Sequence, residues 1–112
     1  MYTYSLQLTG RHQDRMEFEW DEDKRQRVLA ERRVDILHAA LIFEGPVLTR
    51  VDHRRDYGEG RQISIGLVDG ECFVVVHTPR EGRTRLITAW KGGRHDRDIY
   101  EARIARGSAP DE

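Results

Sequence analysis

The sequence predicts an α+β fold in which two N-terminal helices pack on a four- to five-stranded antiparallel sheet, followed by a C-terminal helix. Two observations predict this class. Residues 22–43 and 94–106 carry helical patterns, whereas residues 47–90 hold apolar runs separated by short turns. Because short turns join antiparallel neighbours, residues 47–90 predict one sheet. A chain of 112 residues suffices for a single core.

The segment before the sheet predicts a short strand and two helices. Phe18–Trp20 reads as the strand, and Asp21 is a favourable N-cap for a helix over about Glu22–Arg32. The apolar stripe of Asp35–Phe43 predicts the second helix, and Gly45–Pro46 ends it.

Four strands and a final helix follow. Asp69–Gly70 is the dipeptide expected in a tight type I′ hairpin. Cys72–Val76 is apolar on both faces, which predicts a central strand. The final helix is expected over Arg94–Arg106. The expected strands are Val47–Val51, Arg61–Val68, Glu71–Thr78 and Arg83–Trp90.

The expected domain covers residues 16–106. Residues 1–15 are interpreted either as an extra edge strand, because Tyr2, Tyr4, Leu6 and Leu8 alternate with polar residues, or as an N-terminal extension with little role. Residues 107–112 are expected to form a flexible tail.

Charge is unevenly distributed along the chain. Only Lys24 and Lys91 are lysines, so 17 of the 19 basic residues are arginines, and the formal net charge is −1. Residues 17–24 hold five acids and one base, whereas residues 77–97 hold six bases and two acids. Arginine binds phosphate in planar, bidentate geometry. The pattern indicates a field that steers a polyanion, or alternatively a set of solvated faces.

The location is predicted to be cytoplasmic. The single Cys72 cannot form an internal disulfide, and no apolar run approaches the roughly 18 residues that span a membrane.

An ordered set of motifs carries a family resemblance from about Met16 to about Arg103. The chain resembles the BrnT family of bacterial toxins, which are ribonucleases of the RelE-like superfamily. The motifs are Phe18-Glu19-Trp20-Asp21, Asp56-Tyr57-Gly58-Glu59-Gly60-Arg61, His77-Thr78-Pro79-Arg80, Arg83 to Lys91, and Tyr100.

The resemblance implies an endoribonuclease toxin domain over residues 16–106, with a RelE/BrnT-like fold. It also implies a cognate BrnA-like antitoxin with a ribbon-helix-helix DNA-binding domain. The toxin would then contact operator DNA only indirectly, through the antitoxin. A heterotetramer of toxin and antitoxin is compatible with this arrangement. RNA is the implied substrate, and no membrane or cofactor is expected.

Cleavage of RNA requires a deprotonated 2′-hydroxyl, stabilisation of the phosphorane and a protonated leaving group. Strand alternation predicts that Arg83, Arg85, Ile87, Ala89 and Lys91 share one face, where their cations can meet phosphate. The predicted catalytic residues are Arg61, His77, Arg80, Arg85 and Lys91, and the predicted RNA-binding residues are Arg83, Trp90 and Tyr100.

Each of three predicted roles has a structural alternative. Arg61 can pair with Glu59 or Asp56 and only shape its loop, His77 can be polar surface at a strand end, and Tyr100 can be a packing residue.

Two departures from the family pattern bear on activity and fold. Trp90 stands where the family usually has an arginine, although an indole can stack on a base. Glu31-Arg32-Arg33 stands where a Lys-His-Gly turn is usual, so the helix end should change. The first departure favours a second hypothesis, a degenerate toxin fold that binds antitoxin or RNA without cleavage. No histidine or cysteine spacing predicts a metal site.

Overall fold

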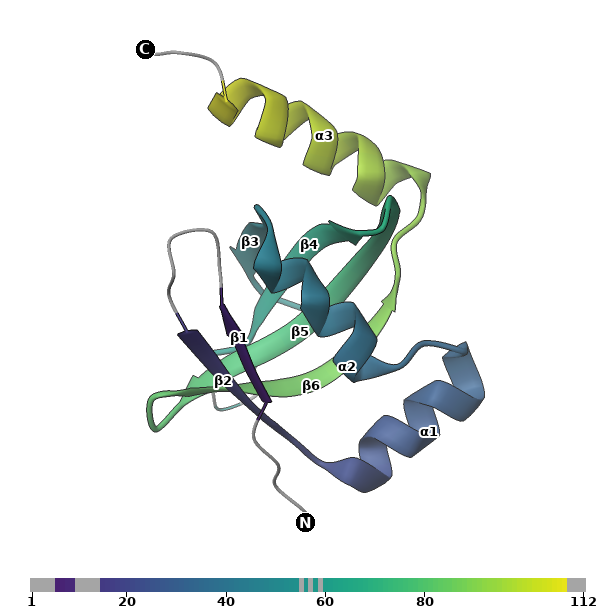
Figure 1. The fold of residues 1–112 in the computed structure, drawn as a ribbon, viewed down its shortest axis with the longest axis vertical. Coiled ribbons are helices and arrows are strands. Elements are labelled where there is room, and N and C mark those ends of the chain that lie inside the picture. Colours follow the sequence, from purple (N-terminus) through teal and green to yellow (C-terminus); the bar gives the residue numbers. More distant parts are fainter. Residues whose placement is uncertain (1–5, 10–14, 55, 57, 59, 109–112) are drawn as a thin grey trace.

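The computed structural model describes residues 6–9, 15–54, 56, 58 and 60–108. Within these residues, six strands form one sheet in the order β1-β2-β6-β5-β4-β3 (Figure 1). The strands are β1 Leu6–Thr9, β2 Arg15–Trp20, β3 Leu48–Val51, β4 Gln62–Val68, β5 Glu71–Arg80 and β6 Arg83–Lys91. The helices are α1 Glu22–Arg32, α2 Ile36–Ala39, the 3₁₀ helix η1 Ala40–Glu44, and α3 Arg94–Ser108. None of the helices in this part of the chain is long and apolar enough to cross a membrane.

The predicted α+β class is confirmed, but the sheet is mixed rather than antiparallel. β2 pairs in parallel with β6, with Phe18 opposite Thr84 and Trp20 opposite Leu86. No turn motif in the sequence predicts this pairing, because both N-terminal helices and three strands lie between β2 and β6 in the chain. β1 adds an antiparallel edge strand to β2.

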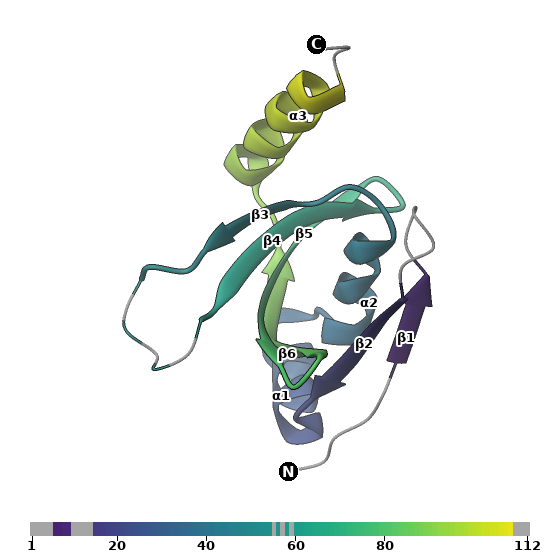
Figure 2. The ribbon, with the colours of Figure 1, turned by 90° about the vertical axis from the view of Figure 1, so that its left-hand side faces the viewer.

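The two faces of the sheet carry different helices. Figure 2 shows α2 on one side of the bent sheet. In the same view α3 lies above the sheet and α1 lies at the bottom. We call the side covered by α2 and η1 the α2 face; its core includes Phe18, Phe73, Val75, Leu86 and Ala89. We call the opposite side the α3 face; its core includes Ile63, Ile65, Val74, Val76 and Tyr100.

The first helix has the predicted bounds and the predicted N-cap. The Asp21 carboxylate accepts hydrogen bonds from the backbone N–H groups of Asp23 at 3.0 Å and Lys24 at 3.4 Å. At the other end Arg33 takes the left-handed conformation, with φ 58°, and its N–H bonds to the carbonyl of Leu29. An arginine therefore occupies the strained position that glycine usually fills.

The second helix is shorter than predicted. The α-helix ends at Ala39, and a 3₁₀ turn carries the chain to Gly45. η1 packs so closely on β4 that a Cβ added at Gly66 would lie 2.7 Å from Cβ of Ile42. The hairpin at Asp69–Gly70 has positive φ at both residues, as a type I′ turn requires.

A β-bulge in β6 corrects the predicted distribution of side chains. Val76 pairs with Thr88, but His77 pairs with Leu86, so one residue of β6 is extra. The alternation of side chains between the two faces of the sheet therefore changes at this bulge. Leu86 and Ala89 both lie on the α2 face, whereas Ile87 and Trp90 lie on the α3 face. The prediction that Arg83, Arg85, Ile87, Ala89 and Lys91 share one face is therefore wrong, because simple alternation does not survive the bulge.

Candidate functional site

A polar cavity of about 180 Å³ lies where the start of α1 meets β6 and the residue before β4. Its lining includes Arg61, Arg85, Lys24 and Asp21. Three separate segments therefore bring cations to one depression, which we call the cation pocket. The structure thus unites Arg61 and Arg85, two predicted catalytic residues that are far apart in the sequence.

A buried carboxylate holds the arginines next to this pocket. Glu19, on β2, is only 6% exposed, and its Oε2 lies 3.4 Å from Nη1 of Arg85 and 3.7 Å from Nε of Arg80. Its Oε1 lies 3.8 Å from Nη1 of Arg83, which also pairs with Glu17 at 3.2 Å. Parallel pairing puts Glu19 directly opposite Arg85. The Arg85 side chain is 13% exposed, so Glu19 fixes a guanidinium that is largely removed from water.

The acidic and basic segments of the sequence are in part interleaved in space. Because β2 lies against β6, the acids of residues 17–19 are interleaved with Arg80, Arg83 and Arg85. The site is a mixed cluster in which cations are in excess, and a polyanion must compete with Glu17 and Glu19 for some of them.

His77 lies on the other face of the sheet. It is 6% exposed, its Nε2 is hydrogen bonded to Oγ of Ser64 at 2.7 Å, and Phe43 packs edge-on against its ring. Ser64 is bonded in turn to Thr49 at 2.6 Å. Burial lowers the pKa of His77 to about 4. The imidazole is therefore neutral near pH 7, and the structure does not bring it to the cation pocket.

The buried imidazole predicts a pH-dependent stability. Because the folded-state pKa lies below the ordinary value of about 6.5, the unfolded chain binds this proton more readily, and stability falls as pH falls below 6.5 towards 4. We expect the free energy of unfolding to drop by about 1 kcal/mol from this group between pH 7 and pH 5.5. Urea denaturation of the His77→Gln variant should show that drop removed. The same change at the exposed His95 is the control, and equal pH dependence of the wild type and His77→Gln would contradict the assignment.

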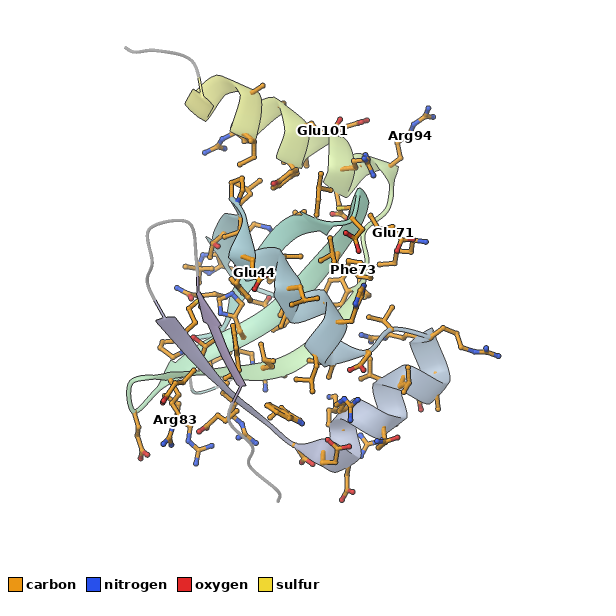
Figure 3. All side chains as sticks on the ribbon, in the orientation of Figure 1. Glu44, Glu71, Phe73, Arg83, Arg94 and Glu101 are labelled. Carbon is orange, nitrogen blue, oxygen red and sulfur yellow. The ribbon has the colours of Figure 1, made fainter. Side chains whose placement is uncertain are left out.

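Two other predicted site residues also lie away from the pocket. The side chain of Lys91 pairs with Glu71 at 3.0 Å. Arg83 and Lys91 are the first and last residues of β6, and Figure 3 shows Glu71 and Arg83 on opposite sides of the molecule, so Lys91 is far from the glutamate–arginine cluster. Tyr100, on α3, is buried, and its hydroxyl donates to the carbonyl of Pro46 at 2.8 Å. This contact ties α3 to the start of β3.

Trp90, predicted to stack on a base, has guanidinium groups against its ring. Cζ of Arg32 lies 5.6 Å from the ring centroid, and Cζ of Arg54 lies 5.5 Å from it. Both are within cation–π range.

Five residues at or near the pocket were missed by sequence reasoning: Glu19, Asp21, Lys24, Arg32 and Arg54. Asp21 was recognised only as a helix cap, although the same position also lines the pocket. One signal was available for Glu19, since a charged residue between Phe18 and Trp20 must point away from their core. The turn around Gly58 and the alternative pairing of Arg61 with Glu59 involve residues outside the described ranges.

A second cavity, of about 360 Å³, lies between α3 and strands β3 and β4. Its walls include apolar side chains from Leu48, Ile65 and Ile99 and cations from Arg50 and Arg103. None of the described residues that line it is a predicted site residue.

Comparison with known proteins identifies the family. A family model described as the ribonuclease toxin BrnT of type II toxin-antitoxin systems matches residues 20–96, which is more than half of the chain. The match contains Arg61, Arg85 and Lys24, while Glu19 and Tyr100 lie outside its ends. A search of curated proteins gave no match. Because this match covers more than half of the chain, the chain belongs to the BrnT family of ribonuclease toxins of type II toxin-antitoxin systems.

Proposed function

We propose that the protein is an endoribonuclease toxin that cleaves RNA in the cation pocket. The observation that carries the proposal is the convergence of Arg61, Arg85 and Lys24 on one depression. A phosphodiester gains negative charge on its way to the phosphorane, and fixed cations stabilise that charge most where they are already oriented. Glu19 supplies the orientation for Arg85, because it holds this largely buried guanidinium in place.

The proposed chemistry is attack by the 2′-oxygen on the adjacent phosphorus. The new P–O2′ bond forms as the P–O5′ bond breaks, which leaves a 2′,3′-cyclic phosphate and a 5′-hydroxyl end. Asp21 is the carboxylate residue among the described lining residues. We assign it as the general base that accepts the proton of the 2′-hydroxyl. The ammonium of Lys24 donates to the leaving O5′, and the two guanidiniums hold the non-bridging oxygens.

Arg80 and Arg83 extend this site toward the turn between β5 and β6. Both side chains are about half exposed, and both contact Glu19 from its outer side. We assign them to the phosphates that flank the scissile one. Because these contacts are exposed, their contribution is to affinity and its salt dependence rather than to the chemical step.

Type II toxin-antitoxin membership implies an antitoxin partner. We propose a BrnA-like ribbon-helix-helix protein that reaches operator DNA itself and covers the cation pocket. An acidic segment suits this role, because it can replace the RNA phosphates on Arg80 and Arg83, the most exposed members of the cluster.

A binding module without cleavage is the second candidate function. It is favoured by the burial of Arg85 against Glu19, since a guanidinium already paired with a carboxylate is less available to a phosphate. RNA binding without product formation would support this alternative.

Incubation of purified protein with RNA distinguishes the two functions. We expect fragments that end in 2′,3′-cyclic phosphate and 5′-hydroxyl groups, because the pocket offers charge and proton transfer to 2′-oxygen attack. Substrate with 2′-deoxy nucleotides should bind and remain intact. Cleavage of that DNA-like substrate at the same rate, or bound RNA that stays whole, would contradict the proposed chemistry.

A further inference from the structure

We propose that Trp90 is a positioning residue that fixes the three cation-bearing segments of the pocket relative to one another; this inference rests on the proposed function. Trp90 is half-buried on the α3 face of β6, three positions after Ile87, which lines the pocket. Three residues of strand span about 10 Å, so the indole lies close to the site but is not among its described lining residues.

The first segment held by Trp90 is α1. Arg32, in its last turn, places Cζ 5.6 Å from the indole centroid. Its Nη1 also donates to Oγ1 of Thr88 at 2.9 Å and to the carbonyl of Ala89 at 3.1 Å. These three contacts attach the C-terminal end of α1 to β6. The N-terminal end of the same rigid helix carries Lys24 into the pocket.

The second segment joins β3 to β4. Arg54 lies 5.5 Å from the indole centroid, and it forms a bidentate pair with the buried Asp52 at 2.9 and 2.8 Å. The backbone N–H of Asp52 donates to the carbonyl of Arg61 at 2.9 Å. Contacts therefore run from Trp90 through Arg54 and Asp52 to the residue that brings the second cation to the pocket.

The third segment is β6 itself, which carries Trp90 and Arg85. Each segment that supplies a pocket cation thus also supplies a member of the Arg32–Trp90–Arg54 stack or is bonded to it. A shift of about 1 Å in a reacting group can cost roughly a hundredfold in rate. Truncation of the indole should therefore reduce cleavage even though Trp90 does not line the pocket.

Double-mutant cycles test this inference. Single-turnover cleavage is measured for the wild type, Trp90→Leu, Trp90→Phe, Arg61→Ala and the double variant Arg61→Ala/Trp90→Leu. We expect Trp90→Leu to lose about tenfold or more in rate, and Trp90→Phe, which keeps an aromatic face, to recover most of it. In the Arg61→Ala background the same Leu substitution should cost less than it does in the wild type, because one of the three cations that Trp90 positions is already absent.

The same five proteins are titrated with an uncleavable 2′-deoxy-substituted oligonucleotide, and their melting temperatures are compared. A wild type that fails to cleave, with non-additive affinities, would overturn the proposed function and leave the positioning role intact. Additive penalties in both measurements would overturn the positioning role, and so would a Phe variant as impaired as the Leu variant at equal thermal stability. In these last two outcomes the wild type would still cleave RNA, so the proposed function would stand.

Discussion

Replacement of Arg61 or Arg85 by alanine is expected to reduce the rate of RNA cleavage by about a hundredfold or more, at unchanged protein levels. Both side chains line the cation pocket. Each substitution therefore removes one preorganised hydrogen-bond donor that would stabilise the developing charge of the phosphorane. Arg85→Lys keeps the charge but loses the planar pair of donors, so an intermediate rate is expected. Cleavage of a defined RNA under single-turnover conditions measures all three variants.

Arg94→Ala is the matched control. Arg94 is an exposed arginine at the start of α3, and Figure 3 shows it at the opposite end of the molecule from Arg83. Its removal takes away the same formal charge without touching the pocket, so cleavage should change little. Full activity of Arg61→Ala or Arg85→Ala, with folding checked by melting temperature, would remove that residue from the mechanism.

Glu19→Gln is expected to separate RNA binding from cleavage. The buried carboxylate contacts three arginines, and its neutralisation releases them from a competing anion. Affinity for an uncleavable oligonucleotide should therefore stay equal or rise. The cleavage rate should fall by roughly tenfold to a hundredfold, because Arg85 loses the partner that orients it.

Stability should fall as well. Breaking a buried ion pair costs about 3 to 5 kcal/mol, and we expect roughly half of that here because Arg80 and Arg83 are half exposed. Glu17→Gln is the control, since Glu17 lies on the same strand but is much more exposed. A cleavage rate equal to that of the wild type would show that Glu19 does not position Arg85, and weaker RNA binding would show that Glu19 does not compete with RNA for the arginines.

Local chemistry predicted most elements of this fold. Asp21 begins α1, Asp69–Gly70 forms the hairpin, and Gly45 ends the second helical segment. Each of these depends on neighbours in the sequence, so its signal is visible there. The parallel contact of β2 with β6 depends on tertiary packing alone, and it decides which acids meet which bases. That contact explains why Glu19 and the mixed character of the cluster were missed.

The predicted site was partly assembled by the structure and partly dispersed. Arg61 directly precedes β4 and Arg85 lies on β6, and both strands pair with β5, so the two arginines can line one pocket. Lys91 does not share a face with Arg85, because the bulge in β6 changes which residues of the strand point to each face. His77 departs because β5 continues to Arg80, so the imidazole is inside the sheet rather than at its end. Helical amphipathicity and strand alternation cannot report a bulge or an extended strand in advance.

The central claim is that the scissile phosphate binds between Arg61, Arg85 and Lys24. A crystal structure of the protein with a 2′-deoxy-substituted oligonucleotide tests it most directly. We predict a phosphate whose non-bridging oxygens accept hydrogen bonds from both guanidiniums, with the flanking phosphates on Arg80 and Arg83. A phosphate bound instead beside Arg50 and Arg103 in the cavity under α3, with Arg85 still paired only to Glu19, would contradict the account.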